Sequence, residues 1–362
     1  MTAQDEGRDG TRDWGRDRDG NPEGLNLPAL RKFLETSAAT ASTSGPCVDG
    51  PLRGELLQGG RSNLTYRVSD GVSTWVVRRP PLGGLTPSAH DMGREYRVVR
   101  ALRDTGVPVA RTVALCEDVS VIGTPFSVVE YVPGQVLRTH ADLHSLSPNE
   151  IARCGLALVD VLAHLHAVPY KTVGLGDFGR PDGYLTRQVA RWRDQWTRVS
   201  TLPLADMDAL HARLADVVPT ESEASIVHGD YRIDNAILDP EDPASIRALV
   251  DWEMATLGDP LADLGLHLVY RDPAFDPVLG GAAASTSDAL PSVRDLAERY
   301  ALRSGRDLAP LGFYLGLGYF KIAVIAEGIH ARHLKGLTVG EGFETVGQAV
   351  PLLAAAGLRS LT

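Results

Sequence analysis

One segment, from Ile226 to Leu264, constrains the fold and chemistry of this chain more than any other. Its short apolar runs are bounded by Gly, Pro and Asp clusters, a pattern that predicts short β-strands. Asp230 follows the first run, Asn235 precedes the second, and Asp251 follows the third. We therefore expect these three side chains at the ends of adjacent strands, where their oxygen atoms can converge. Converging oxygen ligands with open positions suit Mg²⁺ held together with substrate phosphates.

Each of these positions also has a purely structural explanation, because Asp and Asn before apolar strands are common turn and cap residues. Their ordered recurrence within one β-rich unit favours the metal-binding interpretation. The interval from Asp230 to Asn235 is that of the protein-kinase catalytic loop, H-R-D-x-x-x-x-N, in which the Asp is the base and the Asn binds metal. Asp251 then stands where the metal-binding Asp of the following strand belongs.

The variants H-G-D at 228–230 and D-W-E at 251–253 resemble those of the aminoglycoside phosphotransferase and choline kinase family, the small-molecule branch of the kinase fold. The resemblance is strongest over residues 226–264 and extends more loosely from about Glu55 to the late helices. It implies an α+β, two-lobed protein-kinase-like fold with a β-rich N-lobe and a mainly helical C-lobe. One subgroup is especially similar: the kinase-like domains fused to acyl-CoA dehydrogenases, and their stand-alone bacterial relatives. That similarity is carried by residues 78–81, 174–196 and 318–332.

Composition and charge narrow the class of protein. With 362 residues, 43% apolar and 23% charged, the chain is long enough for a two-lobed globular enzyme. The net charge of −10 argues against a general binder of nucleic acid or anionic membranes. We expect no membrane span, because no run of about 18 apolar residues occurs, and no signal peptide. Three isolated cysteines suit neither a metal site nor a disulfide framework, so a cytoplasmic location is expected, while the oligomeric state stays open.

Three regions are predicted along the chain. Residues 1–24 are nearly devoid of aliphatic side chains and are expected to form a disordered arm. Residues 25–132 are expected to form a nucleotide-binding N-lobe with a leading amphipathic helix, and residues 133–362 a helical C-lobe with the catalytic loop, metal and acceptor sites. Strands are predicted at 54–58, 64–69, 74–79 and 126–132, and helices at 25–36, 149–166, 293–304, 311–334 and 339–356.

The loop between the first two predicted strands, Gln58 to Asn63, is a candidate phosphate-binding loop. Gly59 and Gly60 carry no side chain, so their backbone N–H groups can approach phosphates closely. Ser62 and Asn63 in the same loop are further candidates for nucleotide binding. Gly-Gly in a hairpin is often only a turn, but its place ahead of a catalytic-loop motif favours the phosphate interpretation.

The resemblance also implies a cation on the third strand that holds the α- and β-phosphates, and this is normally Lys. We align Arg78 with that position, because Val77-Arg78 matches the expected apolar-then-cation pattern. Arg is always charged and can bind phosphate through two N–H groups, so the role survives with a different geometry. Glu95, on the following helix, is its candidate partner. The alternatives are that Arg79 takes this role, that both arginines are surface charges, or that Glu95 is simply exposed.

The family's hinge lies at the end of the strand that contains Glu130, Tyr131 and Val132. The resemblance implies that backbone groups of these three residues bind the adenine edge. It also implies that Asp259, an N-cap candidate, braces the catalytic loop, together with Asp263.

These features predict an ATP- and Mg²⁺-dependent phosphotransferase that acts on a hydroxyl of a small molecule. Asp230 would accept the proton of the hydroxyl, and Asn235 and Asp251 would hold the metal, so that catalysis rests on positioning and charge stabilisation. The subgroup resemblance points to a hydroxy acid or hydroxyacyl compound as acceptor. The basic residues of the late helical region that favour an anionic acceptor are Lys321, Arg332 and Lys335.

Two alternatives remain at this stage. An aminoglycoside or choline-type kinase would need an acidic or aromatic pocket for its cationic acceptor. A catalytically degenerate, nucleotide-binding pseudokinase is supported only by Arg in place of the usual Lys, and the intact Asp230, Asn235 and Asp251 argue against it.

Overall fold

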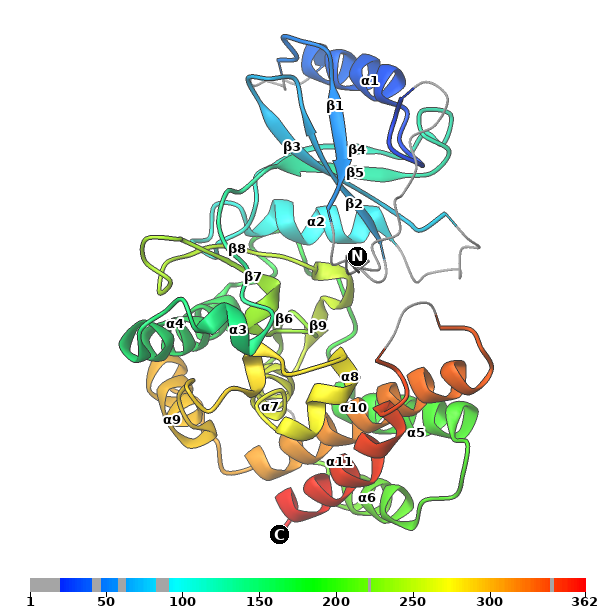
Figure 1. Ribbon diagram of the computed structural model, residues 1–362. Helices are drawn as coiled ribbons and strands as arrows, with labels where there is room; N and C mark the ends of the chain where they lie inside the picture. The colour runs from blue at the N-terminus through cyan, green and yellow to red at the C-terminus, as the bar shows by residue number, and fades with distance from the viewer. Residues whose placement is uncertain (1–19, 41–46, 58–62, 83–90, 221–222, 339–341) are drawn as a thin grey trace, which may run out of the picture. The chain divides into compact units, whose positions relative to one another are not determined.

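The structure is a computed structural model, and it describes residues 20–40, 47–57, 63–82, 91–220, 223–338 and 342–362 (Figure 1). The chain forms two compact units. The first comprises residues up to Arg97 together with Arg111–Tyr131, and the second comprises Val98–Ala110 and Val132–Thr362. The α+β, kinase-like fold class is confirmed, because a β-sheet dominates the first unit and helices dominate the second.

The first unit contains a five-stranded antiparallel sheet with the strand order β1-β2-β3-β5-β4. The predicted strands at 64–69 and 74–79 are confirmed to the residue. The strand predicted at 54–58 spans 53–56, and the strand predicted at 126–132 ends at Glu130. The strands are β1 (Arg53–Leu56), β2 (Leu64–Ser69), β3 (Thr74–Arg79), β4 (Thr112–Cys116) and β5 (Phe126–Glu130). Its helix α1 (Leu27–Thr40) begins two residues later than predicted and extends further. Helix α2 (Met92–Leu102) begins in this unit, and its residues from Val98 on belong to the second unit.

The pleat of β3 separates the two consecutive arginines. Successive side chains of a strand point to opposite faces, and in β3 the buried positions are Trp75, Val77 and Arg79. Arg79 is only 6% exposed and donates hydrogen bonds to the carbonyls of Gly24, Pro80 and Ile122. Arg79 is therefore a buried structural residue of this unit rather than a surface charge.

Residues 20–24 were expected to lie in a disordered arm, and for them this prediction is wrong. Asn21 is buried, and its side-chain oxygen accepts from the N–H of Leu27 at 3.2 Å, at the start of α1. The Tyr66 hydroxyl donates to the Glu23 carbonyl at 2.6 Å. These polar bonds, with the one from Arg79 to Gly24, attach the segment to the sheet. Residues 1–19 lie outside the described part of the chain.

The second unit is mainly helical, and its core runs along α10 (Leu311–Leu334), which packs against α5, α7 and α11 (Figure 1). By length and hydropathy α10 is the one described helix that meets the criteria of a membrane span, but 67% of that stretch is buried inside the unit, as in a core helix. The last helix begins at Val346, seven residues later than predicted. The others are α3 (His140–Leu143), α4 (Pro148–Ala167), α5 (Tyr184–Val199), α6 (Ala205–Asp216), α7 (Pro260–Val269), α8 (Asp276–Leu279), α9 (Val293–Ser304) and α11 (Val346–Ser360).

Two small antiparallel strand pairs carry the segment from Ile226 to Leu264. β6 (Ser225–Val227) pairs with β9 (Thr256–Gly258), and β7 (Ala236–Leu238) pairs with β8 (Ile246–Leu249). Asp230 lies between β6 and β7, Asn235 directly precedes β7, and Asp251 lies two residues beyond β8. The short apolar runs are thus strands, and they end where the sequence pattern placed them.

We expect Arg79→Met to destabilise the first unit by about 2–4 kcal/mol, because it leaves buried carbonyls without a charged donor. Arg67→Met is the matched control: Arg67 lies on the neighbouring strand and pairs with Glu55 at 3.1 Å, but both side chains are largely exposed, so its loss should cost less than about 1 kcal/mol. Denaturant unfolding of both variants measures the difference. Equal unfolding midpoints would contradict the structural role of Arg79.

Candidate active site

Asp230 is the centre of the site in the second unit, and hydrogen bonds fix both of its carboxylate oxygens. The Tyr270 hydroxyl, at the end of α7, donates to Oδ1 at 2.5 Å. The Asn235 amide nitrogen donates to Oδ2 at 3.1 Å and also to the Asp230 backbone carbonyl at 2.8 Å. Arg232 Nε lies 3.4 Å from Oδ2. The carboxylate is thus held in one orientation, and each oxygen keeps lone pairs for a further donor.

The surroundings of Asp230 favour its ionised form. Burial alone would raise its pKa, but the Arg232 charge, the Tyr270 hydrogen bond and the Lys321 charge outweigh burial and lower the pKa below its ordinary value. A carboxylate with a low pKa is a weak base at neutral pH. Asp230 therefore suits a reaction in which it orients a hydroxyl and receives the proton late, rather than one that needs early, complete deprotonation.

His228 connects the loop of Asp230 to that of Asp251. With a proton on Nε2, its ring donates to the Val250 carbonyl at 3.0 Å, while Nδ1 accepts from the Asp230 N–H at 3.4 Å. The ring also lies against the Trp252 side chain, with 4.6 Å between the ring centroids. A single buried imidazole therefore holds the residue before Asp251 and the backbone of Asp230 in fixed relation.

Asp263, in the first turn of α7, anchors the backbone of the catalytic loop. Its two carboxylate oxygens accept from the N–H groups of His228 at 2.5 Å and Gly229 at 2.8 Å, and its Oδ2 lies 3.4 Å from His166 Nε2. Burial would raise its pKa, but the hydrogen bond and charge of His166 outweigh burial and lower it. Asp263 carries the bracing role that the resemblance implied.

Asp259 does not contact the loop in the same way. Its Oδ1 accepts from the Leu261 N–H at 2.9 Å, which caps α7, and its Oδ2 accepts from the Tyr314 hydroxyl at 2.9 Å. It is a helix cap, as its position before Pro260 suggested.

Asn235 and Asp251 form a donor set that fits a hard cation. Both Asn235 hydrogen bonds to Asp230 use its amide nitrogen, so its amide oxygen is the atom left to ligate. The Val250 N–H donates to the Asn235 carbonyl at 2.9 Å, which brings the two ligand-bearing segments together. Asp251 has φ 67°, and no other described non-glycine residue has a positive φ. Left-handed backbone at a single Asp is typical of functional sites. Two oxygen ligands with waters and phosphates completing the sphere suit Mg²⁺.

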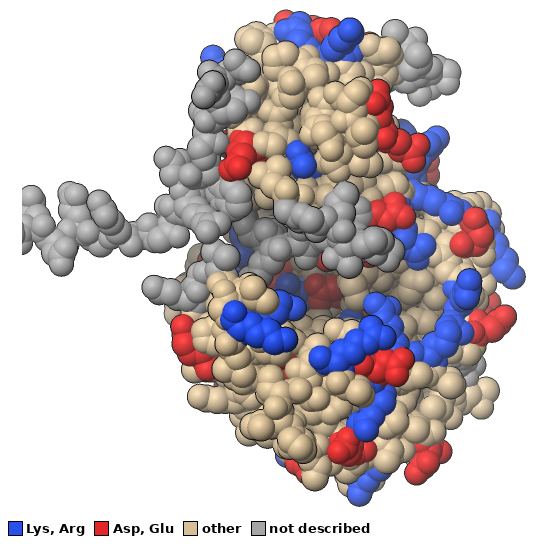
Figure 2. Space-filling view, turned by 90° about the vertical axis from the view of Figure 1, so that its right-hand side faces the viewer, with Lys and Arg blue, Asp and Glu red and all other residues tan. Residues whose placement is uncertain are grey.

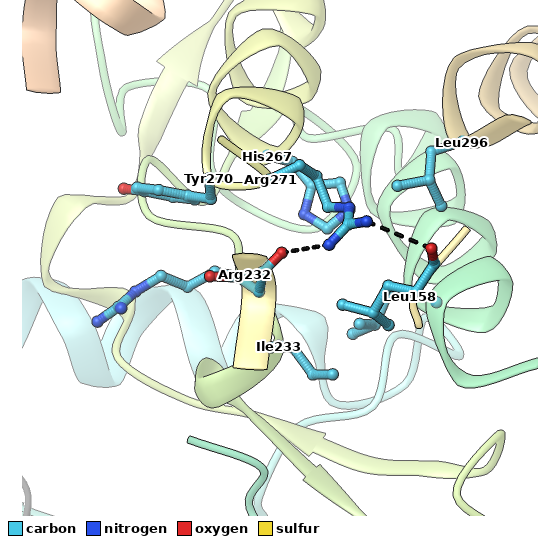
Figure 3. A pocket seen from close by; sticks show the side chains of 10 residues that line it. Leu158, Arg232, Ile233, His267, Tyr270, Arg271 and Leu296 are labelled. Carbon is cyan, nitrogen blue, oxygen red and sulfur yellow. Dashed lines mark hydrogen bonds between the residues drawn. The ribbon is translucent and has the colours of Figure 1, made fainter. Parts of the chain in front are cut away.

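Sequence reasoning missed Tyr270 and Arg232, and it named Lys321 only as a residue that favours an anionic acceptor; all three act on Asp230. Figure 3 shows Tyr270 and Arg232 extending in the same direction, away from a cavity near Leu158 and Leu296, and the Arg232 guanidinium carbon lies 5.7 Å from the Tyr270 ring centroid. The cavity, about 20 Å³, has room for about one water molecule and is too small for an acceptor. Tyr270 and Lys321 lie 40 and 92 residues from the loop atoms that they bind, so no local pattern signals them.

In the first unit, the predicted pair of Arg78 and Glu95 is present. Arg78 Nη1 lies 2.6 Å from Glu95 Oε1, and both side chains are largely buried, at 17% and 9% exposure. A pair held this closely fixes the direction of the guanidinium group. Asn63 is buried at the start of β2. Gly59, Gly60 and Ser62 lie outside the described residues, so their predicted contacts with phosphate stay predictions.

Two of the backbone N–H groups predicted to bind the adenine edge already have hydrogen-bond partners in the first unit. The Glu130 N–H donates to the Arg111 carbonyl at 2.8 Å, and the Tyr131 N–H donates to the Thr74 carbonyl at 3.0 Å. Neither N–H is available to a base, because each already has a partner. The backbone groups that are still predicted to bind the adenine edge are the carbonyls of Glu130 and Tyr131 and those of Val132.

Comparison with known proteins gives the family. The model of the phosphotransferase enzyme family matches residues 53–296. Mouse acyl-CoA dehydrogenase family member 10 is 37% identical over 316 residues, which is 85% of this chain and 28% of the relative. Human acyl-CoA dehydrogenase family member 11 is 35% identical over 304 residues, 83% of this chain and 39% of the relative. The chain thus spans well under half of the length of these relatives.

Solved structures agree. A Ralstonia eutropha protein that carries the name aminoglycoside phosphotransferase has a TM-score of 0.79 and 33% identity, covering 93% of this chain and 98% of its own. Aminoglycoside phosphotransferase APH(4)-Ia, in complex with ADP and hygromycin B, has a TM-score of 0.58, 15% identity and coverages of 92% and 98%; at that identity the likeness concerns the fold alone. The chain belongs to the phosphotransferase enzyme family, the group of small-molecule phosphotransferases to which the aminoglycoside enzymes belong.

Proposed function

We propose that this protein transfers the γ-phosphoryl group of ATP, with Mg²⁺, to a hydroxyl group of a hydroxy acid or hydroxyacyl compound. The observation that carries the proposal is the arrangement around Asp230: an ionised carboxylate held on both oxygens, next to an Asn and an Asp that offer hard oxygen ligands. Nucleotide use is supported by the ADP, AMP-PNP and GDP complexes of structures with the same fold.

The residues of this chain would divide the chemistry as follows. Asp230 accepts the hydrogen bond of the acceptor hydroxyl, so that the hydroxyl oxygen faces the γ-phosphorus, and it takes the proton as the new O–P bond forms and the bond to the ADP oxygen breaks. Tyr270 and Asn235 prevent rotation of the carboxylate during this step. Arg78, aimed by Glu95, would hold the α- and β-phosphates. A magnesium ion between Asn235, Asp251 and the phosphates would supply charge neutralisation.

The proposed class of acceptor is inferred from the proteins to which this chain is similar. The proteins that share 35–37% identity with this chain are named for acyl-CoA dehydrogenases, and the matched region covers only part of them. A kinase-like region within proteins of acyl metabolism supports a hydroxylated acyl compound or its free acid. An aminoglycoside acceptor is the second candidate, favoured by the name of the Ralstonia structure. A screen of nucleotide hydrolysis against hydroxy acids, their thioesters and aminoglycosides tests both classes side by side.

Removal of the Asp251 carboxylate should weaken binding of Mg·ATP at least about 10-fold and leave adenosine binding unchanged, because only the phosphates share the metal. Asp251→Asn is preferred to Asp251→Ala as the test variant, since Asn tolerates the positive φ of 67° at this position and the backbone should keep its conformation. Calorimetric titration measures the affinities. Equal Mg·ATP affinities for the variants and the wild type would contradict the metal assignment.

Substitution of Arg78 should raise the Michaelis constant for ATP about 10- to 100-fold, the range for loss of a charged hydrogen bond. Arg78→Met alone would leave Glu95 buried without its cation and destabilise the unit, so the double variant with Glu95→Gln is used. Arg78→Lys should keep part of the affinity, because it retains charge but not the two-pronged geometry. If steady-state kinetics of both variants matched the wild type, another residue would hold the phosphates.

Asp230→Asn should lower turnover of the acceptor by about 10²–10⁴-fold. The fold and ATP affinity should persist, because the amide oxygen can still accept from Tyr270. Asp239→Asn is the matched control: both carboxylates are 24% exposed, and Asp239 pairs with Arg247 at 2.8 Å. Product formation and the melting temperature are measured together. Turnover of Asp230→Asn near the wild-type rate, at an unchanged melting temperature, would disprove the proposed mechanism.

A further inference from the structure

Lys321 brings a positive charge from the core helix α10 to the catalytic loop. Its ammonium donates to the Gly229 carbonyl at 2.7 Å, at the residue directly before Asp230. It also lies 5.7 Å from the centroid of the Trp192 ring on α5. The side chain is partly buried, so the aliphatic stem lies within the helical unit while the ammonium reaches the site.

Lys321 differs from the other buried cations of the chain in its partners. Arg79 and Arg271 each donate to three backbone carbonyls, which together neutralise much of the cost of burying a cation. The Lys321 ammonium has three donors, and among the described residues only Gly229 accepts from it, with no carboxylate in an ion pair. Asp230 and Asp263 act on it through space alone. A partly buried cation with two unused donors is an incomplete site, because buried charges normally have a partner.

The surroundings of Lys321 add further positive charge. The Arg191 guanidinium lies 5.7 Å from the same Trp192 ring, and its charge acts on Lys321. Helix α5 as a whole carries four Arg and one Asp. Figure 2 shows Lys and Arg side chains interspersed with Asp and Glu on the face of the second unit turned to the viewer. The charges of Lys321 and Arg191 together favour an anion and disfavour a cationic ligand.

We propose that Lys321, with Arg191 behind it, binds an oxyanion of the acceptor, a carboxylate or a phosphate, and so selects anionic acceptors. This inference rests on the proposed function, since it concerns the molecule whose hydroxyl meets Asp230. The oxyanion would lie beside Gly229, within reach of the two N–H groups of the ammonium that the Gly229 carbonyl does not occupy. A cationic aminoglycoside would meet repulsion from these two cations there.

A merely structural role is the competing explanation, in which Lys321 only braces the Gly229 carbonyl. The two roles differ in what they do to acceptors of different charge. Loss of a brace would lower turnover of every acceptor alike, because it displaces Asp230. Loss of an oxyanion ligand would raise the Michaelis constant of anionic acceptors and leave neutral ones unchanged.

The first test compares ω-hydroxy carboxylates of two to about six carbons with the matching neutral ω-hydroxy amides, since the spacing between hydroxyl and oxyanion is open. The wild type should prefer acids over amides at least about 10-fold in kcat/KM, the lower end for a charged hydrogen bond. Lys321→Met should remove that preference with amide turnover within about two-fold, and Lys321→Arg should keep part of it. Lys171→Met is the control and should behave as the wild type, because Lys171 is an exposed lysine beyond α4 whose ammonium also lies over an aromatic ring, that of Tyr170.

A second test works without turnover. Lys321 and Lys171 are labelled with acetic anhydride and the rates are read by mass spectrometry, with inorganic phosphate or the hydroxy carboxylates as probes. These probes should slow labelling of Lys321 several-fold while the amides do not, and labelling of Lys171 should be unaffected. Absence of protection, or an equal loss of acid and amide turnover in Lys321→Met, overturns the oxyanion site. Protection of Lys321 in a wild type that phosphorylates none of the compounds would support the site and count against the proposed function.

Discussion

The Asp263 carboxylate is the interaction on which the catalytic loop depends. It accepts from two successive backbone N–H groups, of His228 and Gly229, and so sets the direction in which the chain leaves β6. Gly229 has φ 82°, and a Cβ there would lie 2.7 Å from the Met254 carbonyl oxygen, so the turn has no room for a side chain. The position of Asp230 follows from that turn. Without the Asp263 acceptor, two buried donors would lose their partner at a cost of about 1–3 kcal/mol each.

A continuous polar network extends from this anchor to every group of the site in the second unit. His228 contacts both the Asp230 N–H and the Val250 carbonyl, next to Asp251. The Asn235 amide donates to the carboxylate and the backbone carbonyl of Asp230. The Tyr270 hydroxyl, at the end of α7, donates to the other carboxylate oxygen of Asp230. Helix α7 therefore contributes at both ends, with Asp263 in its first turn and Tyr270 after its last. Polar networks of this kind make the segments that they join rigid, so the loop is held at several points at once.

The sequence predicted the local parts of this arrangement and missed the distant ones. Asp230, Asn235 and Asp251 follow from short apolar runs and their boundaries, and the strands 64–69 and 74–79 follow from alternation. The contacts of Tyr270 with Asp230 and of Lys321 with Gly229 are set by tertiary packing, so no periodic signal predicts them, although Lys321 itself was named for an anionic acceptor. Two adjacent arginines could not be ranked by composition. The pleat of β3 separates them, because a shift of one residue exchanges the faces of a strand: Arg79 is buried, and Arg78 pairs with Glu95.

Each unit fixes charged groups through contacts among its own described residues. In the first, Glu95 lies 2.6 Å from Arg78, and in the second Asp263 holds the catalytic loop through the N–H groups of His228 and Gly229. The cost of ordering these side chains is therefore met during folding rather than during ligand binding. In the proposed phosphoryl transfer, groups ordered in this way would stabilise developing charge without first reorganising.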